Sequence, residues 1–326
     1  MVRVIDHLGK SSIMLVNQIS GAQRWVITGG SGFLGTNFLS QIGEDIEAVV
    51  ISREAPVWPV RRSQIRYVEQ DVREVEAYRN ELIPGSVVVH MASNSYPGKA
   101  EKAIESDIQD NVLGTIRLAQ ACVQQGVRAL IFLSSGGAVY GEQSIVPISE
   151  NANLRPISAY GAMKTSIETY LAVLHHVHGL PVAILRVGNA FGPWHHSSQG
   201  AINVFMRKLQ KDEPIEIWGD GKQIRDYVYA PDVARAIYIV SQNFNSGFEV
   251  FNVGTGQGRG LTEVLKSCEL VTGKRALIHF YEARDIDIRV NVLDAKKIQT
   301  KFGWQPMVSF ERALAETWKW VQDFKF

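Results

Sequence analysis

The stretch WVITGGSGFLG, residues 25–35, decides the fold of this chain. Its apolar beginning, residues 25–28, predicts a buried strand, and a helix is expected to open at Phe33. Glycines between them have the spacing that permits a tight turn, close approach of backbone to a pyrophosphate, and close packing of helix on strand. The stretch therefore predicts a dinucleotide-binding loop, with an ordinary strand-to-helix turn as the alternative. Its residues are Gly29, Gly32, Phe33, Leu34 and Gly35.

Outward from this loop, short apolar runs alternate with longer helix-like segments. The runs cover residues 25–28, 48–51, 65–68, 87–90, 129–135 and 181–187, and the helical segments cover 33–43, 101–125 and 158–178. Continuous apolar runs suit strands that are buried on both faces. The alternation predicts an α/β fold of the Rossmann type, a doubly wound parallel sheet with helices on both sides.

The amino-acid composition changes after about residue 189, where glycine, proline and tryptophan become frequent. We expect a dinucleotide-binding domain over residues 24–188 and a smaller α/β substrate lobe over 189–326. A strand near 249–254 is expected to return to the main sheet. Residues 1–23 precede the first clear strand and are expected to form an extension outside the fold. His195 and His196 lie at the junction, where contact with substrate is an open alternative.

Bulk properties narrow the class of protein. The chain has 326 residues and a formal net charge of +1, which gives no case for binding nucleic acid or an acidic membrane. No apolar run approaches the length that spans a bilayer. Only two cysteines occur, Cys122 and Cys268, so we expect no disulfide framework and a cytoplasmic protein. The histidines at 175, 176 and 178 have no carboxylate or cysteine to complete a metal site, so no metal is expected.

The segment SAYGAMKTS places Tyr160 and Lys164 on one face of a helix, one turn apart. A tyrosine is a poor base at neutral pH, because its reference pKa is about 10. A neighbouring ammonium favours the phenolate, which can then exchange a proton with a sugar hydroxyl while hydride moves to or from a nicotinamide. The alternative is a surface pair on a helix, but the glycine loop upstream favours acid–base chemistry.

Further motifs accompany the glycine loop and the Tyr160/Lys164 pair. They are Asp71-Val72, Asn111, Ser134-Ser135, Tyr140-Gly141, Asn189, Trp218-Gly219, RDYVY at 225–229, the Arg284/Asp287 pair and FGW at 302–304. The joint set resembles the extended short-chain dehydrogenase/reductases, and among them the NAD-dependent epimerase/dehydratase family with its nucleotide-sugar 4-epimerases. The resemblance runs from about residue 24 to residue 326.

For the cofactor, the resemblance implies that Asp71 and Val72 flank the adenine and that Asn111 belongs to the same site. Tyr160 and Lys164 would bind the nicotinamide ribose and carry the acid–base chemistry.

For the substrate, the resemblance implies that Asn189, Arg225 and Arg284 hold the diphosphate of a nucleotide sugar, with Trp218 near its base. Guanidinium groups suit a diphosphate, and a flat apolar ring suits a uracil. For Arg225 the alternative is a salt bridge to Asp226 or to another neighbour.

The chain departs from the family at residues 134–141, SSGGAVYG. Family members place a serine or threonine four residues before the tyrosine that is Tyr140 here, where its hydroxyl bonds the sugar 4-oxygen. Gly136 stands at that position. Ser135 carries the nearest hydroxyl and is our candidate, with backbone or water as the alternative.

A second departure follows the strand over 48–51. In the family an aspartate there binds both ribose hydroxyls of NAD, but Ser52 and Arg53 stand at this position. A serine and an arginine together can bind the 2′-phosphate of NADP. The alternative is a solvent-facing arginine, so the cofactor is predicted as NAD or NADP.

Together these features predict a nucleotide-sugar 4-epimerase acting on a UDP-hexose or UDP-N-acetylhexosamine through a 4-keto intermediate. Asn291 stands where a bulky tyrosine closes the pocket of some hexose-specific epimerases, so room for an N-acetyl group is expected. The alternatives are an NADPH-dependent reductase of a 4-keto-6-deoxy nucleotide sugar and a dinucleotide sensor without turnover. The resemblance also implies a homodimer that packs through the helices expected at 101–125 and 158–178.

Overall fold

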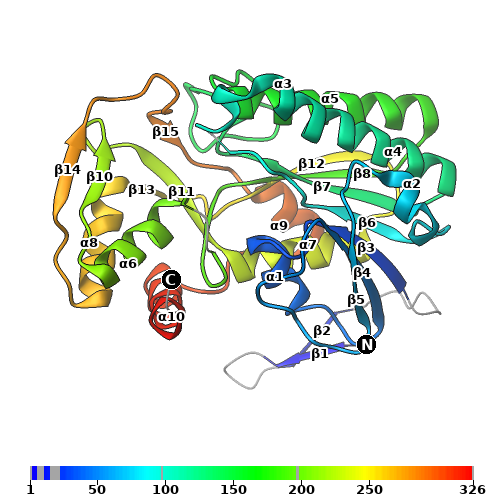
Figure 1. The fold of residues 1–326 in the computed structure, drawn as a ribbon, viewed down its shortest axis with the longest axis horizontal. Coiled ribbons are helices and arrows are strands. Elements are labelled where there is room, and N and C mark those ends of the chain that lie inside the picture. Colours follow the sequence, from blue (N-terminus) through cyan, green and yellow to red (C-terminus); the bar gives the residue numbers. More distant parts are fainter. Residues whose placement is uncertain (1, 6–10, 15–22, 97, 196–197, 325–326) are drawn as a thin grey trace.

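A seven-stranded parallel sheet forms the centre of the molecule (Figure 1). The computed structural model describes residues 2–5, 11–14, 23–96, 98–195 and 198–324. In spatial order the strands are β12 (Phe248–Val253), β8 (Val182–Val187), β7 (Ala129–Ser135), β6 (Val87–His90), β3 (Gln23–Thr28), β4 (Ile46–Ser52) and β5 (Ile65–Glu69). The α/β fold predicted from alternating strands and helices is confirmed.

Helices cover both faces of this sheet, because successive side chains of a buried strand point to opposite sides. In β3, Trp25 and Ile27 pack into one hydrophobic core and Val26 packs into the other. The first core is covered by α1 (Phe33–Leu39), α7 (Ala230–Asn243) and α9 (Lys296–Phe302). The second is covered by α2 (Val75–Tyr78), α4 (Gly114–Gln125) and α5 (Ala159–His178), of which α5 and α4 lie above the sheet in Figure 1.

The strand order reverses beside β3. The chain runs outward from β3 through β4 to β5, and then returns to place β6 on the other side of β3. The connections that follow β3 and β6 therefore run to opposite sides of the sheet. A crevice opens between them, at the carboxyl ends of these two strands. The short 3₁₀ helix η1 (Arg79–Glu81) follows α2 on the way to β6.

The helical segment predicted over 101–125 is interrupted. It consists of a 3₁₀ turn η2 (Ala100–Lys102), α3 (Ile104–Asp107), a π-helical turn η3 (Ile108–Leu113) and α4. Polar side chains compete for backbone acceptors here: Asn111 Nδ2 donates to the Asp107 carbonyl at 3.1 Å, and Thr115 Oγ1 donates to the Asn111 carbonyl at 2.6 Å.

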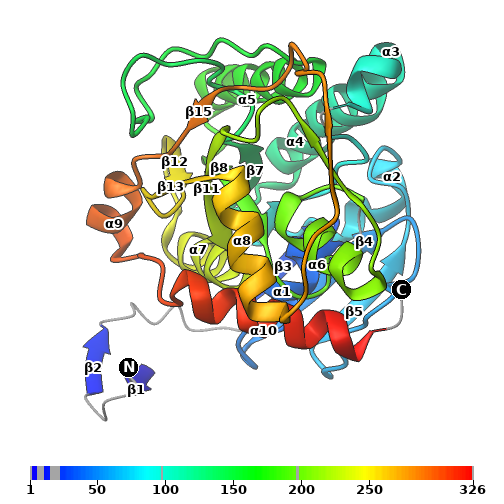
Figure 2. The same cartoon turned by 90° about the vertical axis from the view of Figure 1, so that its left-hand side faces the viewer.

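Smaller sheets are formed mainly by the part of the chain that follows β8. In one, β9 (Asn189–Phe191), β13 (Gly258–Gly260) and β15 (Val290–Asn291) all pair with β11 (Ile224–Tyr229), and in the other β10 (Ile215–Trp218) pairs with β14 (Ile278–Tyr281). Helices α6 (Ala201–Lys211), α8 (Leu261–Thr272) and α10 (Phe310–Asp323) gather around a third core, as Figures 1 and 2 show from two sides.

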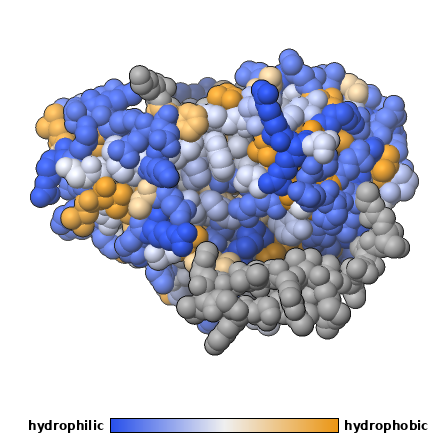
Figure 3. Space-filling view, turned by 90° about the horizontal axis from the view of Figure 1, so that it is seen from below, coloured by the Kyte–Doolittle hydropathy of each residue, from blue (hydrophilic) through white to orange (hydrophobic). Residues whose placement is uncertain are grey.

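At the amino-terminal end, β1 (Val2–Ile5) pairs antiparallel with β2 (Ser11–Met14). The rest of the extension predicted over 1–23 lies outside the described residues, apart from Gln23, which begins β3. His196 also lies outside them. Figure 3 shows one face of the molecule, on which hydrophilic side chains surround separate apolar patches. Within the described ranges, no helix is long and apolar enough to cross a membrane.

Candidate functional site

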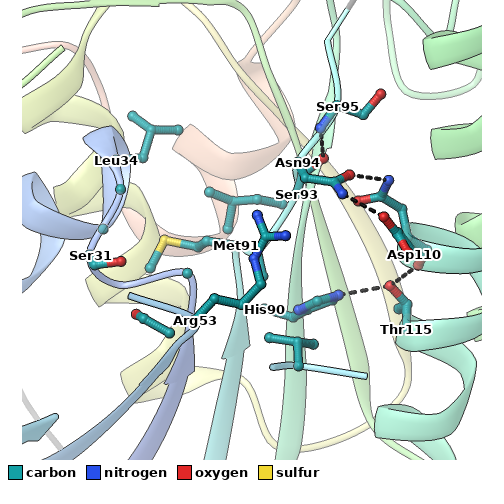
Figure 4. Close-up of a pocket in the computed structure, with 18 of the residues that line it drawn as sticks. Ser31, Leu34, Arg53, His90, Met91, Ser93, Asn94, Ser95, Asp110 and Thr115 are labelled. Atoms are coloured by element: carbon teal, nitrogen blue, oxygen red, sulfur yellow. Dashed lines mark hydrogen bonds between the residues drawn. The ribbon is translucent and has the colours of Figure 1, made fainter. Parts of the chain in front are cut away.

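A cavity of about 650 Å³ opens at the carboxyl ends of the central strands, at the reversal point of the sheet. Every residue predicted to bind a cofactor lines it: Gly29, Gly32, Phe33, Leu34, Gly35, Ser52, Arg53, Asp71, Val72, Asn111, Tyr160 and Lys164. Part of this lining is drawn in Figure 4. The six predicted substrate-binding residues are not among the described residues that line the cavity.

The glycine loop leaves no room for side chains at two of its positions. Gly29 has a φ of +74°, which L side chains rarely adopt, and a Cβ there would lie 2.6 Å from the Ala92 backbone. A Cβ on Gly35 would lie 2.5 Å from the Gly30 Cα and carbonyl oxygen. At Gly32 an added Cβ would meet only the Gly29 carbonyl oxygen, at 3.3 Å. The loop thus presents bare backbone to the cavity, as a bound pyrophosphate requires.

The end of β4 brings together polar groups that could hold the adenosine end of a dinucleotide. The Ser52 side chain is 7 % exposed, and its hydroxyl has no hydrogen-bond partner among the described residues. Arg53 is exposed and points into the pocket in Figure 4. An unpartnered hydroxyl beside a guanidinium fits a phosphate or a hydroxyl of a ribose.

Asp71 lies beside these two residues, paired with Arg73. Arg73 donates to the Asp71 carboxylate at 2.8 and 3.0 Å and to Asp110 at 2.5 Å. This hydrogen bonding is the main cause that holds the pKa of Asp71 below its usual value, and the charge of Arg53 adds a smaller effect. Arg73, which our sequence reasoning did not single out, therefore puts a second guanidinium at this end of the cavity.

A line of hydrogen-bonded polar side chains, among them Asp110 and Asn94 in Figure 4, continues along the cavity from Arg73. Asn94 Nδ2 donates to Asp110 at 2.7 Å, and Asn111 Nδ2 donates to Asn94 Oδ1 at 3.0 Å and to Asp107 Oδ1 at 2.9 Å. These bonds fix the wall of the cavity that faces the glycine loop.

Two histidines also line the cavity. His90 is held at its Nδ1 by Thr28, 2.6 Å away, and at its Nε2 by Thr115, 2.8 Å away. Burial lowers the pKa of His90 to about 3, so its ring is neutral. The His195 ring packs edge-on against Phe33, with 4.4 Å between centroids. His90 was missed because a histidine ending a buried strand carries no local pattern that distinguishes it.

Tyr160, Lys164 and Ser135 meet where β7 ends against α5. The Ser135 side chain is hydrogen-bonded to the Tyr160 phenol, which lowers the phenol pKa, but desolvation outweighs this and raises it to about 12. Lys164 Nζ donates to the Leu133 carbonyl at 2.9 Å and lies 5.9 Å from the centre of the Tyr160 ring. Burial lowers the pKa of Lys164 to about 8. A phenol, a hydroxyl and an ammonium thus converge as acid–base chemistry on a hydroxyl requires.

The glycine at 136 has a packing reason. A Cβ there would lie 2.5 Å from Leu293 Cδ1 and 3.1 Å from the Arg186 carbonyl oxygen, so the hydroxyl residue common in the family does not fit without a shift. Asn291 is 0 % exposed, and its Nδ2 donates to the Gly136 carbonyl at 3.0 Å. This buried side chain therefore supports the backbone at Gly136, and its contact with substrate stays a prediction.

The small sheet around β11 brings three of the predicted substrate residues together. Arg225 is in register with Asn291 on β15, and Tyr227 is in register with Asn189 on β9. Arg225 Nη1 donates to the Ile224 carbonyl at 2.9 Å. The salt bridge to Asp226 that we considered is not formed, because neighbouring strand residues face opposite sides, and the buried Asp226 carboxylate accepts from Thr255 and Leu293 instead.

Trp218 and Arg284 lie together in a second group. The Arg284 guanidinium stacks on the Trp218 ring, 4.8 Å from the ring centroid. It also forms a bidentate ion pair with the Asp287 carboxylate, with N–O distances of 2.8 and 2.9 Å. The Tyr281 ring stacks on the Trp218 ring with 5.7 Å between centroids. In the structure, Arg284 therefore already has an anionic partner.

A doubly wound sheet, a bare glycine loop at its reversal point and a Tyr160/Lys164 pair define a class of protein: dinucleotide-dependent enzymes that act on a hydroxyl or carbonyl carbon. Comparison with known sequences narrows this class. Residues 25–254 match the sequence profile described as the NAD dependent epimerase/dehydratase family. The chain belongs to this family, as the motif resemblance predicted, and is an enzyme of it.

Individual relatives span nearly the whole chain. A putative UDP-glucose 4-epimerase of Methanocaldococcus jannaschii is 28% identical over 91% of this chain and 98% of its own. A dTDP-4-dehydro-6-deoxyglucose reductase of Escherichia coli is 30% identical over 87% of this chain and 92% of its own. The crystal structure of a Thermotoga maritima UDP-glucose 4-epimerase with UDP-glucose superposes with a TM-score of 0.86 and 30% identity, covering 92% of this chain and 99% of that one.

Proposed function

We propose that this enzyme is a nucleotide-sugar 4-epimerase that inverts C4 of a UDP-hexose or UDP-N-acetylhexosamine through a transient 4-keto sugar. The observation that carries the proposal is the convergence of Tyr160, Ser135 and Lys164 beside a glycine loop that fits a dinucleotide. Relatives named as UDP-glucose 4-epimerases, similar over nine-tenths of the chain, support this reaction.

In the proposed mechanism Tyr160 removes the proton of the sugar 4-hydroxyl, while Ser135 holds the same oxygen. The Lys164 ammonium stabilises the phenolate, which is needed because burial, despite the hydrogen bond from Ser135, raises the phenol pKa to about 12. A nicotinamide cofactor held by the glycine loop would supply the hydride acceptor and donor that inversion at C4 requires. Since burial lowers the pKa of Lys164 to about 8, this ammonium is progressively lost as the pH rises through that value.

We assign substrate binding to the elements after residue 188 and cofactor binding to residues 24–188. Asn189, on β9, and Arg225, on β11, would take the diphosphate. The Asn189 Oδ1 atom is buried and has no hydrogen-bond partner among the described residues, which suits a ligand contact. Arg284 would bind the diphosphate, and Trp218 would lie against the base. Asp287 holds the Arg284 guanidinium against the Trp218 ring.

Two experiments on the purified protein test this function. First, the protein is denatured and the nucleotide it releases is identified; tightly held NAD is expected of an epimerase. Second, UDP-glucose and UDP-N-acetylglucosamine are supplied, and formation of the C4 epimer is followed without added reductant. If neither sugar is epimerised by protein that contains cofactor, the proposal is overturned.

A second candidate is an NADPH-dependent reductase of a 4-keto-6-deoxy nucleotide sugar. Ser52 and Arg53 favour it, because an unpartnered hydroxyl and a guanidinium at the end of β4 suit the 2′-phosphate of NADP. One relative at 30% identity is named as a reductase of this kind. An empty site after purification, with NADPH bound more tightly than NADH, would support this reaction instead.

The role of Arg53 is tested by Arg53→Ala. We expect NADPH affinity to fall by on the order of tenfold, because a charge-assisted phosphate contact is lost, while NADH affinity stays unchanged. Fluorescence titration with both cofactors measures this. Arg61→Ala, which removes an exposed arginine from the same connection, is the control. Equal losses for both cofactors, or no loss, would contradict a phosphate-binding role.

We further propose a homodimer built through α5 and the α3–α4 region. Large apolar side chains are exposed on these elements: Ile104, Ile108, Leu113, Tyr170, Val173 and Val177. Those at 170, 173 and 177 share one face of α5, as an interface helix requires. A self-complementary pairing of this surface would bury them.

Val173→Asp is expected to turn this dimer into a monomer, because a carboxylate would be buried at the centre of the apolar face. Sedimentation velocity measures the change. Leu270→Asp is the matched control, since Leu270 is 84% exposed on α8, away from that face. A wild-type protein that sediments as a monomer would exclude the proposed interface.

A further inference from the structure

Three consecutive residues of β7 meet three residues of α5 that are one turn apart. Ser135 is hydrogen-bonded to Tyr160. The carbonyl of Leu133 accepts from Lys164 Nζ at 2.9 Å. Between them, Ser134 Oγ donates to Glu168 Oε1 at 2.5 Å. Residues 160, 164 and 168 follow one another along one side of the helix, so Glu168 continues the row formed by the acid–base pair.

Glu168 is held more firmly than a surface carboxylate. It is 4% exposed and forms a buried ion pair with Arg186 of β8, whose Nη2 lies 2.6 Å from Glu168 Oε2. Arg186 also donates to the Tyr140 hydroxyl at 2.9 Å, which in turn donates to Asn252 Oδ1 at 2.7 Å. The carboxylate is therefore tied to β7 directly and to β8 and β12 through this network.

Stability alone does not account for this ion pair. Apolar residues of the same volume stabilise a core as well as or better than a buried ion pair, which has to be stripped of water. The pair lies next to Lys164 and the end of β7, where it can also hold the groups of the active site in place.

Glu168 also acts on Lys164 through its charge. The titratable groups that face Lys164 come from four elements: Tyr160 and Glu168 from α5, Asp107 from α3, His90 from β6, and Arg186 from β8 through Glu168. Two of these groups, Glu168 and Asp107, raise the pKa of Lys164 against the larger lowering by burial. Since His90 is neutral, the carboxylates are what favours the ammonium.

We propose that Glu168 is a positioning residue of the active site, which fixes the end of β7 against α5 so that Ser135 and Lys164 stay aimed at Tyr160. The proposal rests on the proposed acid–base function of Tyr160. Its electrostatic part is that Glu168 helps to keep Lys164 charged in the pH range where the phenolate needs a cation.

The first variant to measure is Glu168→Gln, which keeps the shape of the side chain and removes its charge. We expect the titration of Lys164, followed by NMR of ¹³Cε-labelled lysine in the cofactor-loaded enzyme, to move down by about one pH unit. The alkaline limb of the kcat profile should move in the same direction, and kcat at neutral pH should fall on the order of tenfold. A residue that only fills the core would leave the Lys164 titration in place.

Glu168→Gln leaves Arg186 without its charged partner, so a second variant guards against a folding failure. Ser134→Ala removes only the hydrogen bond from β7 to Glu168. It should lower kcat several-fold, with KM for the sugar and affinity for the cofactor unchanged. Thr169→Ala is the control, because Thr169 is exposed on α5 and its hydroxyl bonds only the Thr165 carbonyl.

The outcomes separate the two proposals. If the wild type epimerises no sugar but the Lys164 titration moves in Glu168→Gln, the proposed function fails and the electrostatic part of the Glu168 role stands. If the wild type epimerises sugars while Ser134→Ala keeps wild-type kcat and the Lys164 titration is unmoved in Glu168→Gln, the positioning role is overturned.

Discussion

Tyr160→Phe should reduce turnover by on the order of a thousandfold or more and leave cofactor binding intact, because general acid–base groups contribute about 10²–10⁴ to the rate. The substitution keeps the ring, which packs against the core under α5, and removes only the hydroxyl that is bonded to Ser135. After this change Lys164 cannot replace the phenol as the proton acceptor, since its Nζ donates a hydrogen bond to the Leu133 carbonyl. The measurement is kcat for C4 epimerisation alongside a cofactor titration.

Tyr170→Phe is the matched control for this experiment. It removes a phenol from the same helix, α5, but Tyr170 is 49% exposed, does not line the cavity, and lies on the face proposed to pair two subunits, where its ring is kept. We expect wild-type turnover from it. Turnover near the wild-type value in Tyr160→Phe itself would contradict the acid–base mechanism. The cavity would then bind a cofactor for a different reaction.

Gly35→Ala should weaken cofactor binding, with a loss of affinity on the order of a hundredfold. A methyl group at this position would lie 2.5 Å from the Gly30 carbonyl oxygen and 2.6 Å from that of Gly29. Both neighbours are backbone, so the loop itself has to shift, and a shift of about 1 Å is enough to spoil a positioned site. Binding of NAD and NADP, measured by calorimetry, reports the loss.

The control for the glycine loop is Gly114→Ala at the start of α4. An added Cβ there meets only Arg73 Cγ, at 3.4 Å, which belongs to a flexible side chain. Thermal melting without cofactor shows whether Gly35→Ala remains folded. A folded Gly35→Ala protein that binds cofactor like the wild type would show that the loop is not the phosphate cradle.

Local patterns were sufficient for most of the fold. The apolar runs at 87–90 and 129–135 became β6 and β7 with the predicted bounds, because strands buried on both faces need unbroken hydrophobic residues. The predicted cofactor-site residues lie around one cavity for a related reason: in a parallel sheet the residues that follow each strand meet at the same edge.

What the sequence did not reveal depends on contacts between distant residues. Gly136 excludes a side chain because Leu293, 157 positions later, occupies the space, and Asn291 is buried because it bonds the same turn. The Arg186–Glu168 pair and the Arg73–Asp110 contact likewise join separate elements. No periodicity or spacing encodes such meetings, which arise only when the sheet and its helices are packed.

The place of β12 in the main sheet has a consequence for synthesis of the chain. β12 pairs with β8 along its whole length, from Phe248 to Val253, although about 60 residues separate the two strands. On the ribosome, β8 therefore emerges with one side unpaired and stays so for several seconds, at roughly 5–20 residues per second. During that time its sequence, apolar except for Arg186, is an open template for another strand. The nascent enzyme would depend on a chaperone most at this stage, before its last main-sheet strand has been made.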